Sequence, residues 1–287
     1  MQQRFLIKLF QLFCFCFLFL NTQAQTYPFS LPDTIKATLN IHTIDTAKCK
    51  NAIMGVNIFH FTESKDKDFI RTMDPIAMRF PHGVWANFYK WTTDTYQQDS
   101  YDNGVFETGL QRDIDEGEIC GIVGLTSLNN EKINATGKGY NVMWTYSVNF
   151  DDAESNVARL KNRRERGLEV KDIELGNEHF WKGQRSNRTK TEADFLRLTK
   201  EISAALKAED PEVRVSIPLS WRRNHATYNR LIAGDKKHFD AISLHRYAGA
   251  DPDVPGESNK AYSSLLTSRL TIYNDVKWLR QNYGPDK

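Results

Sequence analysis

This sequence has few cysteines, no nucleotide-binding motif and almost no net charge. Four cysteines occur in 287 residues, and none forms a Cys-x-x-Cys pair or neighbours a histidine, so the spacing typical of metal sites is absent. The net charge of +2 comes from 38 basic and 36 acidic side chains without a basic stripe, which argues against nucleic acid as a partner. No Gly-x-Gly-x-x-Gly or Walker loop is present. The sequence therefore predicts neither a metal nor another cofactor.

The first 24 residues differ from the rest. Arg4 and Lys8 lead into the apolar run "LFQLFCFCFLFL", and Ala24 precedes a possible cleavage site. This pattern predicts a signal peptide, and hence a protein that is secreted, periplasmic or at the cell surface, with no membrane association after cleavage. A membrane anchor is the alternative, but the run is only about a dozen residues long where a span needs roughly 20.

One domain is the simplest interpretation of the remainder. Residues 25–50 form a lead-in, and no linker or low-complexity block divides residues 51–287. Cys14 and Cys16 leave with the signal peptide. Export would permit a disulfide between Cys49 and Cys120, while two free thiols are the alternative.

Short strand-like runs alternate with helix-length segments along this domain. Several runs are nearly continuously apolar, as in parallel strands covered on both faces. The runs span residues 52–59, 75–80, 140–149, 170–175, 213–219 and 239–247.

Three segments between or after these runs are predicted to be helical. Residues 152–167 open with Asp and close with Gly, residues 191–211 open with Thr and stop at Pro, and residues 263–284 follow the last run. Residues 92–109 are polar and rich in turn formers, which predicts a loop. Residues 118–132 fit a helix or an extra strand, and the βα alternation favours the helix.

Repeated βα units close into a barrel or lie in an open, doubly wound sheet. Polar or aromatic side chains follow several different strands, as on the catalytic face of a barrel. An open nucleotide-binding sheet would need a glycine-rich turn after its first strand, and this sequence has none. We therefore predict a (β/α)8 TIM barrel, of which about six of the eight βα units are present. The side chains in question are His82, Asn177, Glu178, Trp221, His245 and Tyr247.

Glu178 is the candidate for chemistry at these strand ends. In "IELGNE" residues 174, 176 and 178 share one side of a strand, so Glu174 and Glu178 are expected to face the barrel interior, with Glu178 at its mouth. A carboxylate there can serve as a general acid, and the neighbouring Asn177 can bond a hydroxyl-rich ligand. The alternative is a salt-bridged glutamate that caps the next helix.

Aromatic side chains near the same strand ends indicate a sugar ligand. The segment "RFPHGVWANFYKW" places Arg79, His82, Trp85 and Asn87 after the second strand. Flat rings beside charged and amide groups suit sugars, which present CH groups on one face and hydroxyls at the edge. Packing as local core is the other interpretation. We expect Trp85, Trp181 or Trp221 to lie beside Glu178, and Arg79 to reach Glu174 or Glu178, because a buried guanidinium needs a carboxylate.

"RFPHGVWANFYKW", "ELGNEHF" and "ISLHRY", in this order, resemble the clan A glycoside hydrolases, and most closely the group of α-L-arabinofuranosidases, β-xylosidases and heparanase-like β-glucuronidases. The resemblance covers roughly residues 52–287. It implies that Glu178 is the catalytic acid/base and that Asn177 contacts the 2-hydroxyl of the sugar. It further implies that Arg79 holds the nucleophilic carboxylate and that His245 and Tyr247 line the subsite of cleavage.

The chain departs from the family pattern at two places. His82 stands where the family usually has Gly and is a candidate ligand contact. The family's nucleophilic Glu lies at the end of a seventh strand, and this sequence stops at "NYGPDK", where that strand is expected to begin. Glu174 and Glu257 are poorly placed to substitute, so the sequence indicates a fragment or a truncated product.

The resulting hypothesis is a secreted, retaining glycoside hydrolase that acts on poly- or oligosaccharides, without its nucleophile in this chain. One alternative is a non-catalytic carbohydrate-binding barrel. Another is a cell-surface interaction module whose aromatic loops bind a protein.

Overall fold

The computed structural model describes residues 55–58, 64–96, 121–246 and 272–283. All of them belong to one compact unit, Cys49–Lys287. The predicted signal peptide and lead-in, both mature cysteines and Tyr247 lie outside the described residues. Within the described part, no helix has the length and apolarity needed to cross a membrane.

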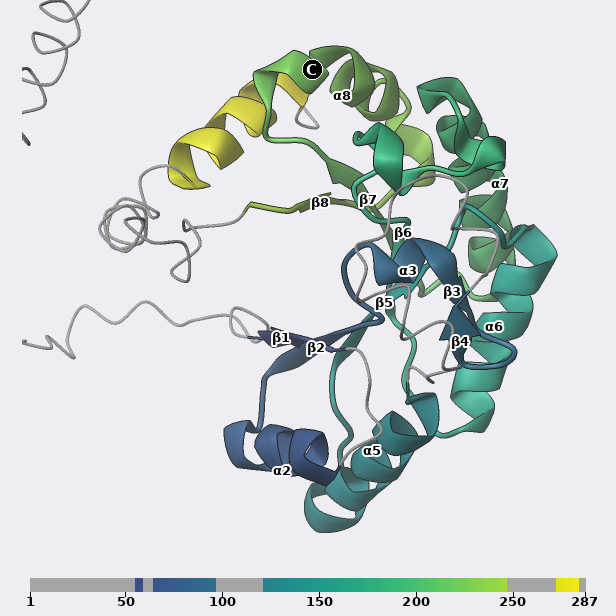
Figure 1. The fold of residues 1–287 in the computed structure, drawn as a ribbon, viewed down its shortest axis with the longest axis vertical. Helices are drawn as coiled ribbons and strands as arrows, with labels where there is room; N and C mark the ends of the chain where they lie inside the picture. Colours follow the sequence, from purple (N-terminus) through teal and green to yellow (C-terminus); the bar gives the residue numbers. More distant parts are fainter. Residues whose placement is uncertain (1–54, 59–63, 97–120, 247–271, 284–287) are drawn as a thin grey trace, which may run out of the picture. The chain divides into compact units, whose positions relative to one another are not determined.

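Six parallel strands form a sheet that curls into a half-barrel, with helices between successive strands (Figure 1). The strands pair in chain order, β1-β2-β5-β6-β7-β8, so each βα unit lies beside the next. The fold is a partial (β/α)8 barrel, as predicted, and each strand lies within one of the six predicted runs. The strands are β1 (Gly55–Asn57), β2 (Ala77–Phe80), β5 (Val142–Tyr146), β6 (Asp172–Leu175), β7 (Arg214–Leu219) and β8 (Ala241–Leu244).

Helices follow each strand, and two begin at the caps that the sequence predicted. Asp152 accepts a hydrogen bond from the backbone of Ser155 at the start of α6, and Thr191 forms a capping box with Asp194 at the start of α7. Residues 118–132 contain most of α5, so helix was the correct choice there. The helices are α2 (Ser64–Met73), α5 (Ile122–Thr136), α6 (Ala153–Glu165), α7 (Glu192–Glu209), α8 (Ala226–Ala233) and residues 272–283.

The prediction of a loop from residue 92 is wrong at its start. A short helix, α3 (Trp85–Phe88), leads into a hairpin of β3 (Tyr89–Lys90) and β4 (Thr95–Tyr96). The carboxylate of Asp94 in its turn accepts a hydrogen bond from the Tyr89 hydroxyl at 2.7 Å and two from backbone N–H groups at the start of α5. This long-range anchoring, which local sequence does not signal, holds the hairpin in place.

The two faces of the curled sheet differ in chemistry. Side chains that point outward are apolar and buried beneath the helices, among them Phe80, Trp144, Ile173, Leu175 and Val215, all 0% exposed. Four residues of α7 supply the matching stripe: Phe195, Leu198, Ile202 and Leu206. Many inward-pointing positions are instead polar, among them Arg79, Thr145, Glu174, Ser216 and Ser243, although Met143 beside Arg79 is apolar. The polar interior is the part of the fold that positions the candidate site.

Gly176 turns the chain away from β6. The strand ends at Leu175, three residues before Glu178, so Glu178 does not reach the barrel mouth by strand alternation as the sequence suggested. Gly176 has φ +73°, and a Cβ there would lie 2.6 Å from the ring of His179, which itself stacks on Phe195 with centroids 4.2 Å apart. Only glycine fits both the backbone angle and the space.

A pair of glycine substitutions separates these two requirements. Gly137, at the end of α5, has φ +76° and no atom within 4 Å of the position that a Cβ would take, so Gly137→Ala should cost roughly 1–2 kcal/mol of unfolding free energy from the backbone alone. Gly176→Ala adds the collision with His179, about 1–3 kcal/mol more. Urea unfolding of both variants measures the difference, and equal losses would contradict this account of the turn.

Candidate active site

Four ionisable side chains meet inside the half-barrel where β2, β6 and β8 end. Arg79 donates from Nε to Glu174 Oε2 at 2.7 Å. The imidazole of His245 then bridges two carboxylates: Nε2 lies 2.8 Å from Glu174 Oε1 and Nδ1 lies 3.1 Å from Glu178 Oε1. The predicted ion pair of Arg79 is therefore confirmed, with Glu174 as its partner. We call these four residues the central network.

Glu174 carries the buried charge of the central network. Its side chain is 0% exposed. Burial raises the pKa of the Glu174 carboxyl, but the charge of Arg79 and the hydrogen bond with His245 outweigh it and bring that pKa to about 2. An ionised carboxylate in the interior is thereby matched by two cationic groups.

His245 is held as an imidazolium. Burial lowers the pKa of its ring, yet the hydrogen bonds with Glu174 and then Glu178 raise that pKa to about 9. Because both ring nitrogens face carboxylate oxygens, both can donate, which requires the doubly protonated ring. A positive charge consequently lies directly beside Glu178 at neutral pH.

Of the two carboxylates in the network, Glu178 is the one that reaches the surface, as do Arg79 and His245 at 14% and 13% exposure. The Glu178 side chain is 12% exposed, whereas that of Glu174 is fully buried. Its backbone has φ +48°, a left-handed conformation that costs a non-glycine residue on the order of 1–3 kcal/mol and that occurs preferentially at functional sites. The surrounding contacts hold this carboxylate in one place at the rim.

Asn87 and Asn177 brace the segment that carries Glu178. The backbone N–H of Asn177 donates to Asn87 Oδ1 at 2.7 Å, and Asn87 Nδ2 returns a bond to the backbone carbonyl of Asn177 at 2.7 Å. The Asn177 side chain accepts from Arg79 at 2.9 Å and donates to Gln184 Oε1 at 3.2 Å. Asn87, predicted to bind substrate, is 0% exposed and instead positions its neighbour. Asn177 is itself 2% exposed, and its contact with the sugar stays a prediction.

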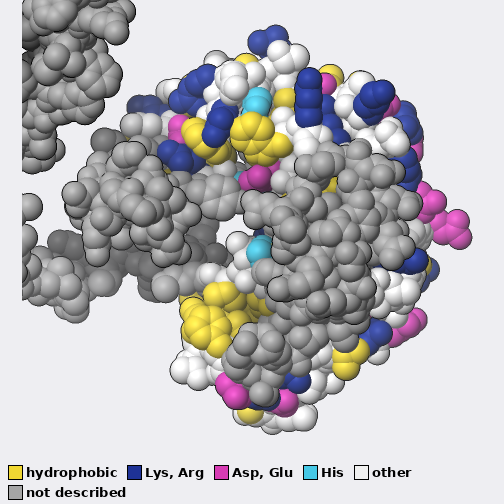
Figure 2. Space-filling view, in the orientation of Figure 1, with side chains coloured by type: hydrophobic (Ala, Val, Ile, Leu, Met, Phe, Trp, Pro, Cys, Tyr) yellow, Lys and Arg dark blue, Asp and Glu magenta, His cyan; other side chains and the backbone are white. Residues whose placement is uncertain are grey.

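The predicted tryptophans lie at the same edge of the sheet as Glu178. Trp85 follows β2 in α3, and Trp221 follows β7. Trp181 lies closest in the chain, and its backbone N–H donates to the carbonyl of Glu178 at 2.8 Å. All three are half-buried, as is His82 beyond β2. Figure 2 views this edge and shows histidine, acidic, basic and hydrophobic side chains together in the region between α8 and residues 272–283.

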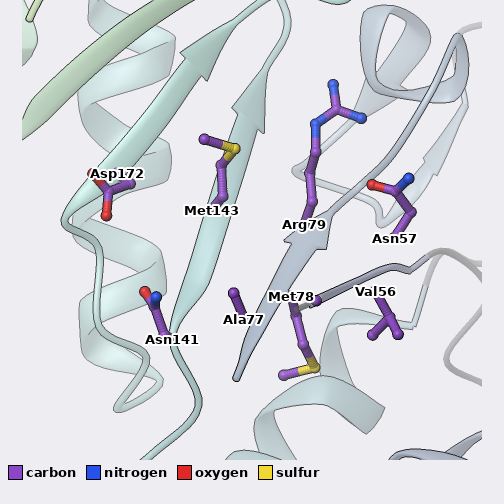
Figure 3. Close-up of a pocket in the computed structure, with 9 residues that line it drawn as sticks. Val56, Asn57, Ala77, Met78, Arg79, Asn141, Met143 and Asp172 are labelled. Carbon is purple, nitrogen blue, oxygen red and sulfur yellow. The ribbon is translucent and has the colours of Figure 1, made fainter. Parts of the chain in front are cut away.

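A cavity of about 280 Å³ opens on the inner face of the sheet below this rim (Figure 3). Residues of β1, β2 and β5 and Asp172 of β6 line it, and Arg79 lies at the end toward which the strand arrows point, with Asn141 at the other end. The cavity thus has a lining of mixed polarity and reaches the central network at Arg79.

Sequence reasoning did not identify two further contributors to the site. Gln184, in the short 3-10 helix η3 (Lys182–Gln184), receives bonds from both Asn87 and Asn177, and Arg222 lies over the ring of Trp181. Neither position carries a periodic or motif signal. Among the described residues, no group of three His, Cys, Asp or Glu side chains is arranged to hold a metal ion.

Comparison with known proteins finds similarity in structure but not in sequence. No protein-family model and no curated protein matches this sequence. Among solved structures, a family 51 α-L-arabinofuranosidase from Bifidobacterium longum superposes with a TM-score of 0.51 and 11% identity, over 76% of this chain and 46% of the other.

Two more solved structures belong to the same broad class. An α-L-arabinofuranosidase from Thermotoga maritima has a TM-score of 0.46 and 16% identity, over 67% of this chain and 40% of its own. A glucosidase from Croceicoccus marinus has a TM-score of 0.39 and 15% identity, over 71% of this chain and 45% of its own. This chain spans less than half the length of each. The superposition with the Bifidobacterium longum structure supports the barrel fold.

The charged state of His245 predicts a pH dependence of stability. A pKa raised from 6.5 to about 9 in the folded state contributes stability that is complete below pH 6.5 and is lost as the pH rises through 9. The full loss is about 3 kcal/mol. We expect His245→Gln to flatten the fall in unfolding free energy between pH 6.5 and 9, measured by urea unfolding. His238→Gln, which alters a histidine paired with Asp235 outside the network, should keep the wild-type slope. Identical slopes in all three proteins would contradict a charged His245.

Proposed function

We propose that this chain forms part of a secreted, retaining glycoside hydrolase in which Glu178 is the general acid/base. The observation that carries the proposal is the rim carboxylate itself: Glu178 is partly exposed, is held in a left-handed backbone conformation, and is bonded to His245, which also pairs with the buried Glu174. Similarity of fold to glycoside hydrolases supports the same conclusion.

Glu178 would protonate the glycosidic oxygen as the bond to the anomeric carbon breaks, and would then take a proton from the attacking water. Asn177 beside it is proposed to bond the 2-hydroxyl of the sugar. His245 positions the Glu178 carboxylate through the 3.1 Å contact and fixes its orientation toward the rim. The half-buried rings of Trp85, Trp181 and Trp221 are proposed to border the bound sugar.

The nucleophile is proposed to come from outside the central network. A retaining enzyme needs two carboxyl groups about 5 Å apart, both able to reach the sugar. Glu174 does not meet this condition, because its side chain is fully buried and its oxygens accept from Arg79 and His245. We therefore expect the chain by itself to bind sugars without cleaving them.

A second candidate function follows from the same observation. With Glu178 as the exposed carboxylate of the central network, the described residues fit a carbohydrate-binding barrel that has no hydrolytic activity. The two functions share a binding site and differ in whether Glu178 can deliver a proton during bond cleavage.

An external nucleophile tests the acid role of Glu178. In the purified chain, azide can attack the anomeric carbon of an aryl glycoside while the phenol leaves with a proton from Glu178. Phenyl α-L-arabinofuranoside, β-xyloside and β-glucuronide are the substrates. We expect no turnover without azide and measurable glycosyl azide with it. Glu178→Gln should lower that rate by about 10²–10⁴.

Two controls make the result specific. The first control is the leaving group: dinitrophenyl glycosides need no acid assistance, so Glu178→Gln should change their rate of cleavage little. The second is Glu201→Gln, which alters an exposed residue of α7 that pairs with Arg197 and should match wild type on every substrate. Turnover without azide that disappears in Glu178→Gln would place a nucleophile within this chain and overturn that assignment. Failure of every sugar to bind would contradict both candidate functions.

A further inference from the structure

Arg222 occupies an unusual place beside the candidate site. Its guanidinium lies 4.6 Å from the ring centroid of Trp181 and 5.0 Å from that of Trp221, so two tryptophans hold one cation. The residue as a whole is exposed. A guanidinium stacked on two rings is fixed in position while its N–H edges remain available for hydrogen bonds.

The two rings locate Arg222 next to Glu178. Trp181 lies three residues after Glu178 and donates its backbone N–H to the Glu178 carbonyl. The other ring, that of Trp221, also carries the guanidinium of Arg246 at 4.3 Å, and Arg246 directly follows His245 of the central network. Arg222 therefore lies between the segments after β6 and β8 that hold the candidate acid and its histidine.

Acidic groups near Arg222 are already occupied. Asp275 accepts from Arg246 Nε at 2.8 Å and lies 3.7 Å from Arg223. Glu178 and Glu174 both pair with His245. Within the described part of the chain, no carboxylate forms an ion pair with the Arg222 guanidinium. Its charge is nonetheless felt nearby, because burial and then the charge of Arg222 lower the pKa of His225.

We propose that Arg222 is a specificity-determining residue that binds an anionic group, a carboxylate or a sulfate ester, on a sugar unit next to the one held at Glu178. This inference rests on the proposed function of the site. A planar guanidinium presents paired donors that match the oxygens of either anion. The flanking rings of Trp181 and Trp221 hold those donors in place before the ligand arrives, which reduces the ordering cost of binding.

Three disaccharides with one skeleton test the proposal and distinguish the two anions: glucosyl-xylose, glucuronosyl-xylose and 6-O-sulfoglucosyl-xylose. At C5 of the first sugar they carry a hydroxymethyl, a carboxylate and a sulfated hydroxymethyl group, respectively. Binding to the purified chain is measured by calorimetry and by the fluorescence of the tryptophans. We expect at least one anionic form to bind about 10- to 100-fold more tightly than the neutral form, with a preference that shrinks at high salt.

Variants assign the preference to Arg222. Arg222→Met should bring the ratio of the neutral to the anionic Kd close to one, and Arg222→Lys should retain part of the preference. Arg223→Met is the matched control, since its guanidinium lies over Trp278 at 3.7 Å, and should keep the full preference.

Each remaining outcome is decisive. Equal binding of all three disaccharides to the wild type, or a preference that survives in Arg222→Met, would overturn the role of Arg222 while leaving the proposed function intact. A chain that binds none of the three, nor any of the aryl glycosides, would overturn the proposed function and this inference with it.

Discussion

The buried charge of Glu174 is the constraint around which the interior is organised. An ionised carboxylate without solvent is costly unless cations and hydrogen bonds compensate it. Arg79 and His245 supply both, at 2.7 Å and 2.8 Å. Since Arg79 belongs to β2, Glu174 to β6 and His245 follows β8, one carboxylate connects three separate βα units. These contacts of Glu174 hold the ends of three strands together, while the helices cover the apolar outer face of the sheet.

Glu178 takes its geometry from the same interaction. The imidazolium that balances Glu174 has a second N–H, and that N–H faces Glu178 at 3.1 Å. The turn at Gly176 and the reciprocal bonds between Asn87 and Asn177 bring the backbone to the place where this contact forms. A single charge network therefore stabilises the interior and fixes the residue proposed to act as the acid. These contacts account for the left-handed backbone at Glu178, whose side chain is 12% exposed.

Local patterns in the sequence carried much of this information. Apolar runs located the six strands, and Asp152 and Thr191 located the starts of α6 and α7, because these signals involve neighbouring residues. The pairing of Arg79 with a glutamate followed from the requirement that a buried guanidinium be compensated. The hairpin anchored by Asp94, the positioning role of Asn87 and the stacking of Arg222 were not foreseen, since they join residues that lie up to about ninety positions apart in the chain and leave no local pattern. The turn at Gly176 was missed because the strand was assumed to continue to Glu178.

The protonation state of His245 tests the central claim most directly. Nitrogen NMR of the histidine rings at pH 7.5 distinguishes an imidazolium from either neutral tautomer, and comparison with His245→Gln assigns the signal. Because both ring nitrogens face carboxylates and the pKa is raised to about 9, the account predicts two protonated nitrogens at that pH. A neutral His245 ring, with one bare nitrogen, would contradict the network on which the position of Glu178 depends.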